Sequence, residues 1–315
     1  MLLSGERIDQ LYADDIQIIQ SKEVFSFSID AVLLANFPQL PKKGKIVDLC
    51  AGNGAVGLFV SRKTAAKIDQ IELQPRLADM GQRSILLNKL EKQVTMYERD
   101  LKQATEVIKK DSVDLVLCNP PYFKERPTSQ KNPNPHLAIA RHEIHTSLQE
   151  VVTVSADLLK TNGRLAMVHR PDRFLDILHA MENANIAPKK ARFVYPKPGK
   201  EANVLLIEGI KQGKKDGFRV LPPLFTYNEK NEYEAEMRLC CMENKKSHYF
   251  YVLLCQDGSF YGGYTTEPER RLTEHNSGTG AKYTRLAKRR PVKMIHTEKF
   301  ETRSAATKAE AAFKK

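Results

Sequence analysis

The sequence lacks the features that mark membrane-spanning, secreted and disulfide-linked proteins. No apolar run approaches the roughly 20 residues that a helix needs to cross a bilayer, so no membrane partner is expected. Charged residues interrupt the first stretch, Met1-Leu-Leu-Ser-Gly-Glu-Arg, and leave no signal-peptide pattern. The 5 cysteines form no C-x-x-C pair, which argues against a disulfide framework or a zinc site. These absences favour a protein of the reducing cytoplasm.

The net charge of +12 is unevenly distributed. Residues 246–315 hold 14 Lys and Arg against 7 Asp and Glu, whereas residues 1–245 hold 36 against 31. Such a basic C-terminal part suits a nucleic acid, because neutralising phosphates dominates the affinity of proteins for nucleic acids. A solvated basic surface is the alternative. No feature of the sequence indicates an obligatory protein partner.

From residue 45 to about 210, short apolar runs alternate with stretches of helical pattern. The predicted strands are Lys45–Leu49, Lys67–Leu73, Val94–Glu98, Val113–Asn119, Gly163–His169, Ala191–Tyr195 and Ala202–Glu208. The predicted helices include Gly54–Lys63, Pro75–Leu90, Ser147–Lys160 and Pro171–Asn185. This alternation predicts an α/β domain with a mostly parallel seven-stranded sheet. The last two strands should pair antiparallel, because Pro196–Glu201 is too short for a crossover helix.

The pattern changes after a polar stretch from Asn228 to Ser247, and we expect one domain over residues 1–243 and another over 246–315. The second domain has two β-rich runs around Asp257-Gly258, then a helix, another strand and a terminal helix. This order predicts a small α+β domain. Within the first domain, Lys124–Pro135 is rich in Pro and Asn and is predicted to be a long loop.

A glycine-rich loop follows the first predicted strand. Gly52, Gly54 and Gly57 satisfy G-x-G-x-x-G, and glycines let a backbone turn tightly and approach a ligand at a helix N-terminus. Glu72 ends the next strand, where a carboxylate can bind ribose hydroxyls. These residues fit a nicotinamide enzyme and a methyltransferase equally well.

The sequence Asn119-Pro120-Pro121-Tyr122 favours the methyltransferase. It stands at the carboxyl end of the fourth predicted strand, where open α/β sheets bind their ligands. Methylating an amino nitrogen conjugated with a ring requires its lone pair to be freed. The Asn119 side-chain oxygen and the Pro120 carbonyl can accept the two amine hydrogens, while Tyr122 offers a stacking face. The two prolines hold these acceptors in place.

Residues from about Leu11 to Leu224 resemble the bacterial tRNA adenine-N6 methyltransferases that modify adenine 37 of a valine tRNA. The matching stretches are Phe25–Ala35, the loop after Asp48, Glu72, Asp100, Asn119–Phe123, Ala140–Glu143, His169-Arg-Pro and Pro222-Pro-Leu. The resemblance implies a Rossmann-like class I methyltransferase fold, S-adenosyl-L-methionine (AdoMet) as cofactor and tRNA as the partner.

The resemblance also implies roles for individual residues. Asp48, Gly52 and Gly54 would line the AdoMet pocket, Glu72 would hold the ribose, and Asp100 would contact the adenine of AdoMet.

Three further residues belong to the matching stretches. Asp30 is expected to help close the cofactor pocket, although an acidic residue at a helix N-terminus is equally ordinary there. Arg141 and His142 are expected to meet an RNA phosphate or the target base, and a surface Arg beside a capping His is the alternative.

Two other enzyme classes share the N-P-P-Y sequence. DNA adenine methyltransferases usually carry a large target-recognition region, for which residues 1–243 leave no segment. Release-factor glutamine methyltransferases usually carry an extra helical N-terminal domain, whereas here only residues 1–44 precede the first predicted strand. A DNA methylase joined to a nuclease, as in restriction-modification, stays the main alternative.

Residues from His248 to Lys315 resemble the small stand-alone GIY-YIG nuclease-like proteins. The match rests on Tyr249–Leu253, Tyr261-Gly-Gly, Arg271 with His275 one helical turn later, the stretch Gly278–Thr284, and Glu310. It implies that Tyr251 and Tyr261 position or activate water and that Arg271 stabilises phosphoryl charge. His275 would be a base or proton shuttle, and Glu310 would bind one divalent ion.

Magnesium suits a site with one acidic ligand, because it keeps several waters. The sequence departs from the family at Tyr264, where many repair nucleases of this superfamily have lysine. Two functions therefore stay open for the second domain, which are cleavage of RNA or DNA and a purely nucleic-acid-binding role.

The loop between Tyr251 and Tyr261 decides whether these two side chains share one face. A two-residue turn at Asp257-Gly258 would place them on opposite faces, because side chains alternate along strands. A three-residue loop, Gln256-Asp257-Gly258, pairs Leu253 with Tyr261 and places both tyrosines on one face. Gly258 suits the left-handed position of such a loop. We predict the three-residue loop, with Arg271 and Glu310 on the same face.

Overall fold

The computed structural model describes residues 2–11, 16–24, 27–122, 146–242, 248–300 and 303–314. The chain divides into two compact units, Met1–Glu243 and Asn244–Lys315. The expected loop over Lys124–Pro135 lies outside the described residues. No helix in the described ranges is long and apolar enough to span a membrane.

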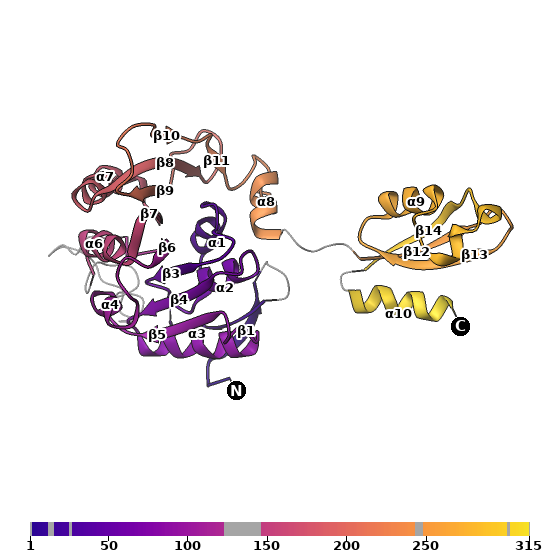
Figure 1. The fold of residues 1–315 in the computed structure, drawn as a ribbon, viewed down its shortest axis with the longest axis horizontal. Helices are drawn as coiled ribbons and strands as arrows, with labels where there is room; N and C mark the ends of the chain where they lie inside the picture. The colour runs from indigo at the N-terminus through magenta and orange to yellow at the C-terminus, as the bar shows by residue number, and fades with distance from the viewer. Residues whose placement is uncertain are drawn as a thin grey trace. The chain divides into compact units, whose positions relative to one another are not determined.

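A nine-stranded sheet forms the centre of the first unit, in the order β10-β8-β9-β7-β6-β3-β4-β5 with β11 beside β8 (Figure 1). Its seven longer strands are β3 (Lys45–Leu49), β4 (Lys67–Glu72), β5 (Val94–Glu98), β6 (Val113–Cys118), β7 (Leu159–His169), β8 (Ile186–Tyr195) and β9 (Val204–Lys211). Strand β9 is antiparallel to β8, as predicted, and also to β7, whereas the other pairs are parallel. The Rossmann-like α/β class is confirmed.

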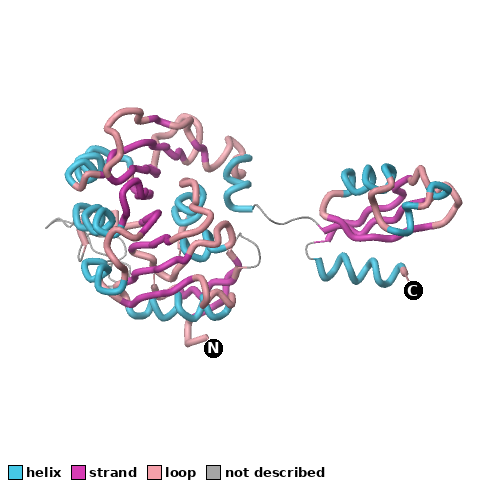
Figure 2. The backbone as a smooth tube through the Cα atoms, in the orientation of Figure 1, coloured by secondary structure: helices cyan, strands magenta, loops and turns pink. Residues whose placement is uncertain are grey.

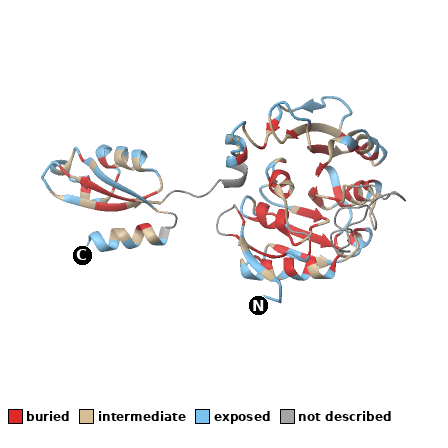
Figure 3. Ribbon diagram, turned by 180° about the vertical axis from the view of Figure 1, so that it is seen from behind, coloured by how far each residue is buried: buried red, intermediate tan, exposed pale blue. Residues whose placement is uncertain are grey.

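Helices cover both faces of this sheet and enclose two apolar cores. One face carries α1 (Ile29–Asn36), α2 (Ala55–Ser61) and α3 (Pro75–Leu87), and the other carries α4 (Ala104–Val107), α6 (Leu148–Leu158) and α7 (Phe174–Asn183). Strand alternation feeds both cores: Leu115 and Leu117 of β6 face one, and Val116 and Cys118 face the other. The central strands β3, β4 and β6 are accordingly buried along most of their length (Figure 3).

Two strands begin earlier than predicted. β7 starts at Leu159, which is buried and paired with Val113, so the preceding helix ends at Leu158 instead of Lys160. The early part of β7 is irregular: Asn162 is left-handed (φ 63°), and the pairing with β6 contains a register shift. This irregularity hides the strand in the sequence pattern. β8 starts at Ile186 and likewise contains a register shift.

Several elements of the first unit were not predicted. Strands β1 (Glu6–Gln10) and β2 (Gln17–Ser21) form a hairpin before the strand that was expected to be first, so that expectation was wrong. The hairpin lies against α3, where the Ser84 hydroxyl accepts the Ile19 N–H at 2.9 Å. Other additions include α4 (Ala104–Val107), β10 (Arg219–Val220), β11 (Leu224–Phe225) and α8 (Ala235–Met242).

The second unit is a three-stranded antiparallel sheet with two α-helices (Figure 2). The strands are β12 (His248–Leu254), β13 (Phe260–Thr265) and β14 (Lys293–Phe300), in the order β13-β12-β14. Helix α9 (Pro268–Ser277) follows β13, and α10 (Arg303–Phe313) ends the unit. Two short 3-10 turns, η3 (Lys282–Arg285) and η4 (Ala287–Arg289), lead from α9 to β14.

The β12–β13 hairpin has the predicted three-residue loop. Gly258 N–H donates to the Cys255 carbonyl at 3.0 Å, and Cys255 N–H donates to the Ser259 carbonyl at 2.8 Å. Gly258 has a φ of 78°, the left-handed conformation that this loop requires. Leu253 therefore pairs with Tyr261, as expected.

Candidate active sites

The glycine loop of the first unit joins β3 to α2 by a tight turn. Gly52 and Gly54 have φ values of 59° and 86°, which glycine adopts without strain. At Gly57, a Cβ atom would lie 2.2 Å from the side-chain nitrogen of Gln70, so only glycine lets α2 approach β4 this closely.

The buried side chains of Asp48 and Gln70 support the loop from the core side. The Asp48 carboxylate accepts the Gly57 N–H at 3.2 Å and a Gln70 amide hydrogen at 3.1 Å, and Gln70 also donates to the Gly54 carbonyl at 3.1 Å. Burial raises the pKa of Asp48 to about 7. Gly52 lines the cavity above the loop, whereas Asp48 and Gly54 are not part of its wall, so the roles that the resemblance implies for these two residues stay predictions. The Asp48 carboxylate is buried beneath the loop and contacts it through the Gly57 N–H.

A cavity of about 400 Å³ opens above this loop, at the carboxyl ends of β3, β4 and β6. Glu72 lines it, and its two oxygens accept the N–H groups of Gly52 at 2.7 Å and Gln74 at 2.8 Å. Burial raises the pKa of Glu72. Apolar walls come from side chains that the sequence did not single out, namely Phe27, Val56, Ile71, Leu73, Leu77 and Leu101.

Asp100 is not on the cavity wall, and its predicted contact with the adenine of AdoMet stays a prediction. It caps the short 3-10 turn η1 (Leu101–Gln103), where its carboxylate accepts the Lys102 N–H at 2.9 Å. Its neighbours Arg99 and Leu101 line the cavity instead. A capping role uses the same residue type as ligand binding, so the sequence pattern did not separate the two.

The stretch Asn119–Tyr122 forms another wall of the same cavity. The hydroxyl of Tyr122 lies 2.5 Å from Asn119 Oδ1 and 2.9 Å from Asp30 Oδ2. A hydroxyl has one hydrogen, so it donates to one of these acceptors at a time. Burial is the main cause that raises the pKa of Asp30 and of Tyr122. Asp30, at the start of α1, also lines the cavity and contacts the Asn119–Tyr122 turn directly.

Residues at the end of β7 hold this turn from behind. The ring of His169 lies 5.1 Å from the ring of Tyr122, and Arg173 donates to the Tyr122 carbonyl at 3.2 Å. His169 accepts the Arg170 N–H through Nδ1 at 2.8 Å, and burial lowers its pKa to about 3. The sequence offered no signal for Arg173. Arg141 and His142 lie outside the described residues.

The second unit brings four of its predicted residues, Tyr251, Tyr261, Arg271 and His275, together on one face. The rings of Tyr251 and Tyr261 lie 6.4 Å apart, so the two tyrosines share a face of the hairpin. From α9, His275 Nε2 lies 2.8 Å from the Tyr251 hydroxyl, and Arg271 Nε donates to the same oxygen at 3.3 Å. Burial is the main cause that raises the pKa of Tyr251 to about 12, with a smaller contribution from the Glu310 carboxylate.

Glu310 comes from α10, whose Phe313 packs on Phe250, a strand neighbour of Tyr251 that points to the other face. Glu310 forms an ion pair with Lys314, whose ammonium lies 5.8 Å from the Tyr261 ring centre. The expected place of Glu310 on the face of Arg271 stays a prediction. Within the described ranges, no group of three or more His, Cys, Asp or Glu side chains could hold a metal ion. An ion bound by Glu310 would need waters or phosphate oxygens as its other ligands.

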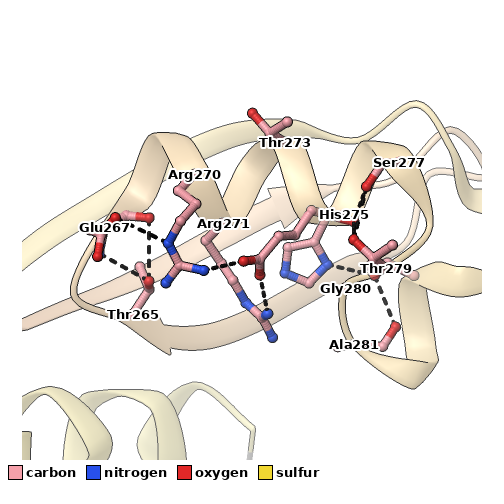
Figure 4. A network of polar contacts seen from close by, with 12 residues as sticks. Thr265, Glu267, Arg270, Arg271, Thr273, His275, Ser277, Thr279, Gly280 and Ala281 are labelled. Atoms are coloured by element: carbon pink, nitrogen blue, oxygen red, sulfur yellow. Dashed lines mark hydrogen bonds and ion pairs between the residues drawn. The ribbon is translucent and has the colours of Figure 1, made fainter.

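Two residues of this site escaped the sequence analysis. Glu274 pairs with Arg271 at 2.6 Å, and the Thr284 hydroxyl lies 2.6 Å from His275 Nδ1 (Figure 4). Thr284 stands in the stretch Gly278–Thr284 that carried part of the resemblance, but its residue type gave no hint of a role.

Two family models match the chain, the methyltransferase small domain over residues 15–194 and the GIY-YIG catalytic domain over residues 247–315. A UPF0213 protein of Enterococcus faecalis is 97% identical over 74 residues, which are 24% of this chain and 84% of that protein. A UPF0213 protein of Listeria welshimeri is 65% identical over 74 residues, which are 24% of this chain and 80% of that protein.

Among solved structures, a predicted O-methyltransferase of Agrobacterium tumefaciens aligns with a TM-score of 0.55 and 19% identity, covering 67% of this chain and 94% of that one. This likeness concerns the fold alone. The expected order of a methyltransferase unit and a GIY-YIG unit is thus confirmed. The chain belongs to the methyltransferase small domain family and ends in a GIY-YIG catalytic domain of the kind found in the UPF0213 proteins.

Proposed function

We propose that the first unit transfers the methyl group of AdoMet to the N6 amine of an adenine in tRNA, with adenine 37 of a valine tRNA as the expected target. The observation that carries this proposal is that Asn119–Tyr122, Gly52 and Glu72 line a single cavity. Its volume of about 400 Å³ suits a small-molecule site. The target base would enter beside Asn119–Tyr122.

The cavity fits AdoMet chemically. The Glu72 carboxylate accepts the N–H groups of Gly52 and Gln74, and a remaining lone pair on it would accept a ribose hydroxyl. Apolar side chains such as Leu101 and Leu77 suit a purine ring. When bound, AdoMet supplies an electrophilic methyl group on a sulfonium.

The residues of this chain would prepare the nitrogen that accepts the methyl group. Asn119 Oδ1 and the Pro120 carbonyl would accept the two amine hydrogens, so that the nitrogen lone pair turns away from the base ring. Tyr122 would stack on the base. Tyr122 is itself held by His169, which packs on its ring, and by Arg173, which donates to its carbonyl. Such fixed acceptors stabilise the charge that develops on the amine.

Methyl transfer from labelled AdoMet to total tRNA, genomic DNA and release factor, measured side by side, tests this proposal. Label in tRNA that disappears with Asn119→Ala is the expected result. Label in DNA alone would replace the proposal with a DNA adenine methylase joined to a nuclease, and label in release factor would indicate glutamine methylation.

For the second unit we infer phosphodiester hydrolysis assisted by one divalent ion, with RNA or DNA as substrate. The cluster of Tyr251, Arg271 and His275 supports it, because it joins a proton acceptor and a cation around one hydroxyl. Glu310 would hold the ion, which supplies charge to polarise a phosphate oxygen. A purely nucleic-acid-binding module is the alternative.

Incubating the full chain with tRNA and with single- and double-stranded DNA, with and without Mg²⁺, separates these two functions. Cleavage that requires Mg²⁺ and is lost in both Arg271→Ala and Glu310→Gln supports hydrolysis. Binding without cleavage under every condition would leave the unit as a nucleic-acid-binding module.

A further inference from the structure

The imidazole of His275 is held between two hydroxyl groups in the interior of the second unit. Its Nε2 lies 2.8 Å from the Tyr251 hydroxyl, and its Nδ1 lies 2.6 Å from the Thr284 hydroxyl. His275 and Thr284 are both 0% exposed, so water does not compete for either contact. Which nitrogen of His275 carries the hydrogen therefore depends on these two hydroxyls.

The partners of the Thr284 hydroxyl favour one tautomer of His275. When this hydroxyl donates its single hydrogen to the Ala281 carbonyl, 3.1 Å away, its oxygen accepts from His275 Nδ1 at 2.6 Å. In this arrangement Nδ1 of His275 carries a hydrogen. Burial, followed by the charge of Arg271, lowers the pKa of His275 to about 4, so the ring is neutral at pH 7. Nε2 is therefore bare and accepts the hydrogen of Tyr251.

The local backbone is built for this contact. The chain after α9 turns at Gly278 and passes the ring of His275 at Gly280 (Figure 4). Thr284, in η3, then contacts Nδ1 of this ring. A Cβ atom at Gly280 would lie 2.7 Å from Nδ1 and 2.8 Å from the Cα of His275. Any larger residue at this position would displace the ring, so the glycine is required by the Thr284–His275 contact.

We propose that Thr284 is a positioning residue of the C-terminal site, which fixes His275 as the Nδ1–H tautomer so that Nε2 can take the hydroxyl proton of Tyr251. The inference rests on the hydrolysis proposed for this unit. As the attacking water gives a proton to the Tyr251 oxygen, Tyr251 gives its own proton to Nε2. The products are a hydroxide that attacks phosphorus and an imidazolium.

This relay conserves protons and needs no further reactant. After attack, the leaving oxygen takes a proton from solvent, and the imidazolium returns its proton to solvent through Tyr251. In the charged state both ring N–H groups keep an acceptor, Thr284 Oγ1 and the Tyr251 oxygen. Arg271 Nε donates to the Tyr251 oxygen throughout and helps to orient its lone pair.

Nuclear magnetic resonance of the full chain with ¹⁵N-labelled histidine tests the tautomer without any need for activity. His275→Gln identifies the His275 signals among the 8 histidines. The expected wild-type result at pH 7 is a neutral ring protonated at Nδ1. A ring protonated at Nε2 would overturn the proposal without the use of any variant.

Two variants separate the effect of the hydroxyl from that of packing, because valine keeps the size of threonine and serine keeps its hydroxyl. Thr284→Val removes the acceptor and should shift His275 towards the Nε2–H tautomer, whereas Thr284→Ser should restore Nδ1–H. In the hydrolysis assay, Thr284→Val should lower kcat at least about tenfold, with KM nearly unchanged, and Thr284→Ser should recover most of it. An unchanged tautomer in Thr284→Val, or an unchanged kcat, would contradict the positioning role.

Different results would refute the hydrolysis by the second unit and the role of Thr284. A wild-type chain that has the Nδ1–H tautomer but cleaves no nucleic acid would refute the hydrolysis proposed for this unit, while the tautomer fixed by Thr284 stands. A chain that cleaves normally with the other tautomer would refute the role of Thr284 alone. Thermal unfolding of each variant confirms that the comparison is made between folded proteins.

Discussion

The Tyr122 hydroxyl lies 2.9 Å from the Asp30 carboxylate, although the two residues are 92 positions apart in the chain. The same hydroxyl lies 2.5 Å from Asn119 Oδ1, the oxygen proposed to accept the target amine. Asp30 thereby offers Tyr122 a second acceptor. When Tyr122 donates to Asp30, Asn119 Oδ1 is released for the amine hydrogen.

Asp30→Ala should lower methyl transfer while leaving AdoMet affinity nearly unchanged. Without the carboxylate, Tyr122 has only Asn119 as acceptor and competes with the target amine. We expect about a tenfold lower kcat, which corresponds to roughly 1.4 kcal/mol. Asp30→Asn is the matched control, because its amide oxygen still accepts the Tyr122 hydrogen and should preserve most of the activity. Equal losses in both variants would show that the carboxylate charge, not the hydrogen bond, matters.

Asn119→Ala should abolish transfer although AdoMet still binds. The loop at Gly52 and the Glu72 carboxylate are untouched, so the affinity measured by titration should stay close to that of the wild type. Loss of a fixed polar group of this kind lowers kcat by about 100-fold or more. If binding and transfer fell together, the turn would belong to the cofactor site.

Asp48→Asn should change how the stability of the first unit depends on pH. Burial raises the pKa of Asp48 from 3.8 to about 7, so the folded state holds the proton more tightly than the unfolded chain does. Its contribution is fully present below pH 3.8 and is lost as the pH rises to about 7, by about 1.4 kcal/mol for each unit of the raised pKa.

Urea unfolding of the wild type and Asp48→Asn, compared at pH 5 and pH 8, measures this difference. The wild type should lose stability relative to the variant at the higher pH. A difference that does not change with pH would mean that Asp48 titrates normally in the folded protein.

Removing residues 246–315 should weaken nucleic-acid binding and flatten its dependence on salt. The slope of log affinity against log salt falls by roughly 0.7–0.9 for each phosphate contact that is lost. Residues 1–243 form a compact unit of their own and should keep their AdoMet affinity, which serves as the control for folding. An unchanged slope would indicate that the basic excess of the C-terminal part is only a solvated surface.

The sequence alone determined features that depend on neighbouring residues. Alternating apolar runs predicted the seven long strands, because each run must bury both faces of a parallel sheet. The turn chemistry of Gly258 predicted the hairpin register and hence the shared face of Tyr251 and Tyr261. Spacing along one strand or one turn is enough for such predictions.

Only the tertiary structure decided which polar side chains reach a site. Asp48 and Asp100 carry suitable groups in matching positions, yet one lies beneath the loop and the other caps a turn. Asp30 and Tyr122 meet, as do His275 and Thr284, because helices and loops pack against sheet ends in ways that no local pattern encodes. Contacts between distant segments depend on the packing of the whole unit, so the geometry of both sites had to come from the fold.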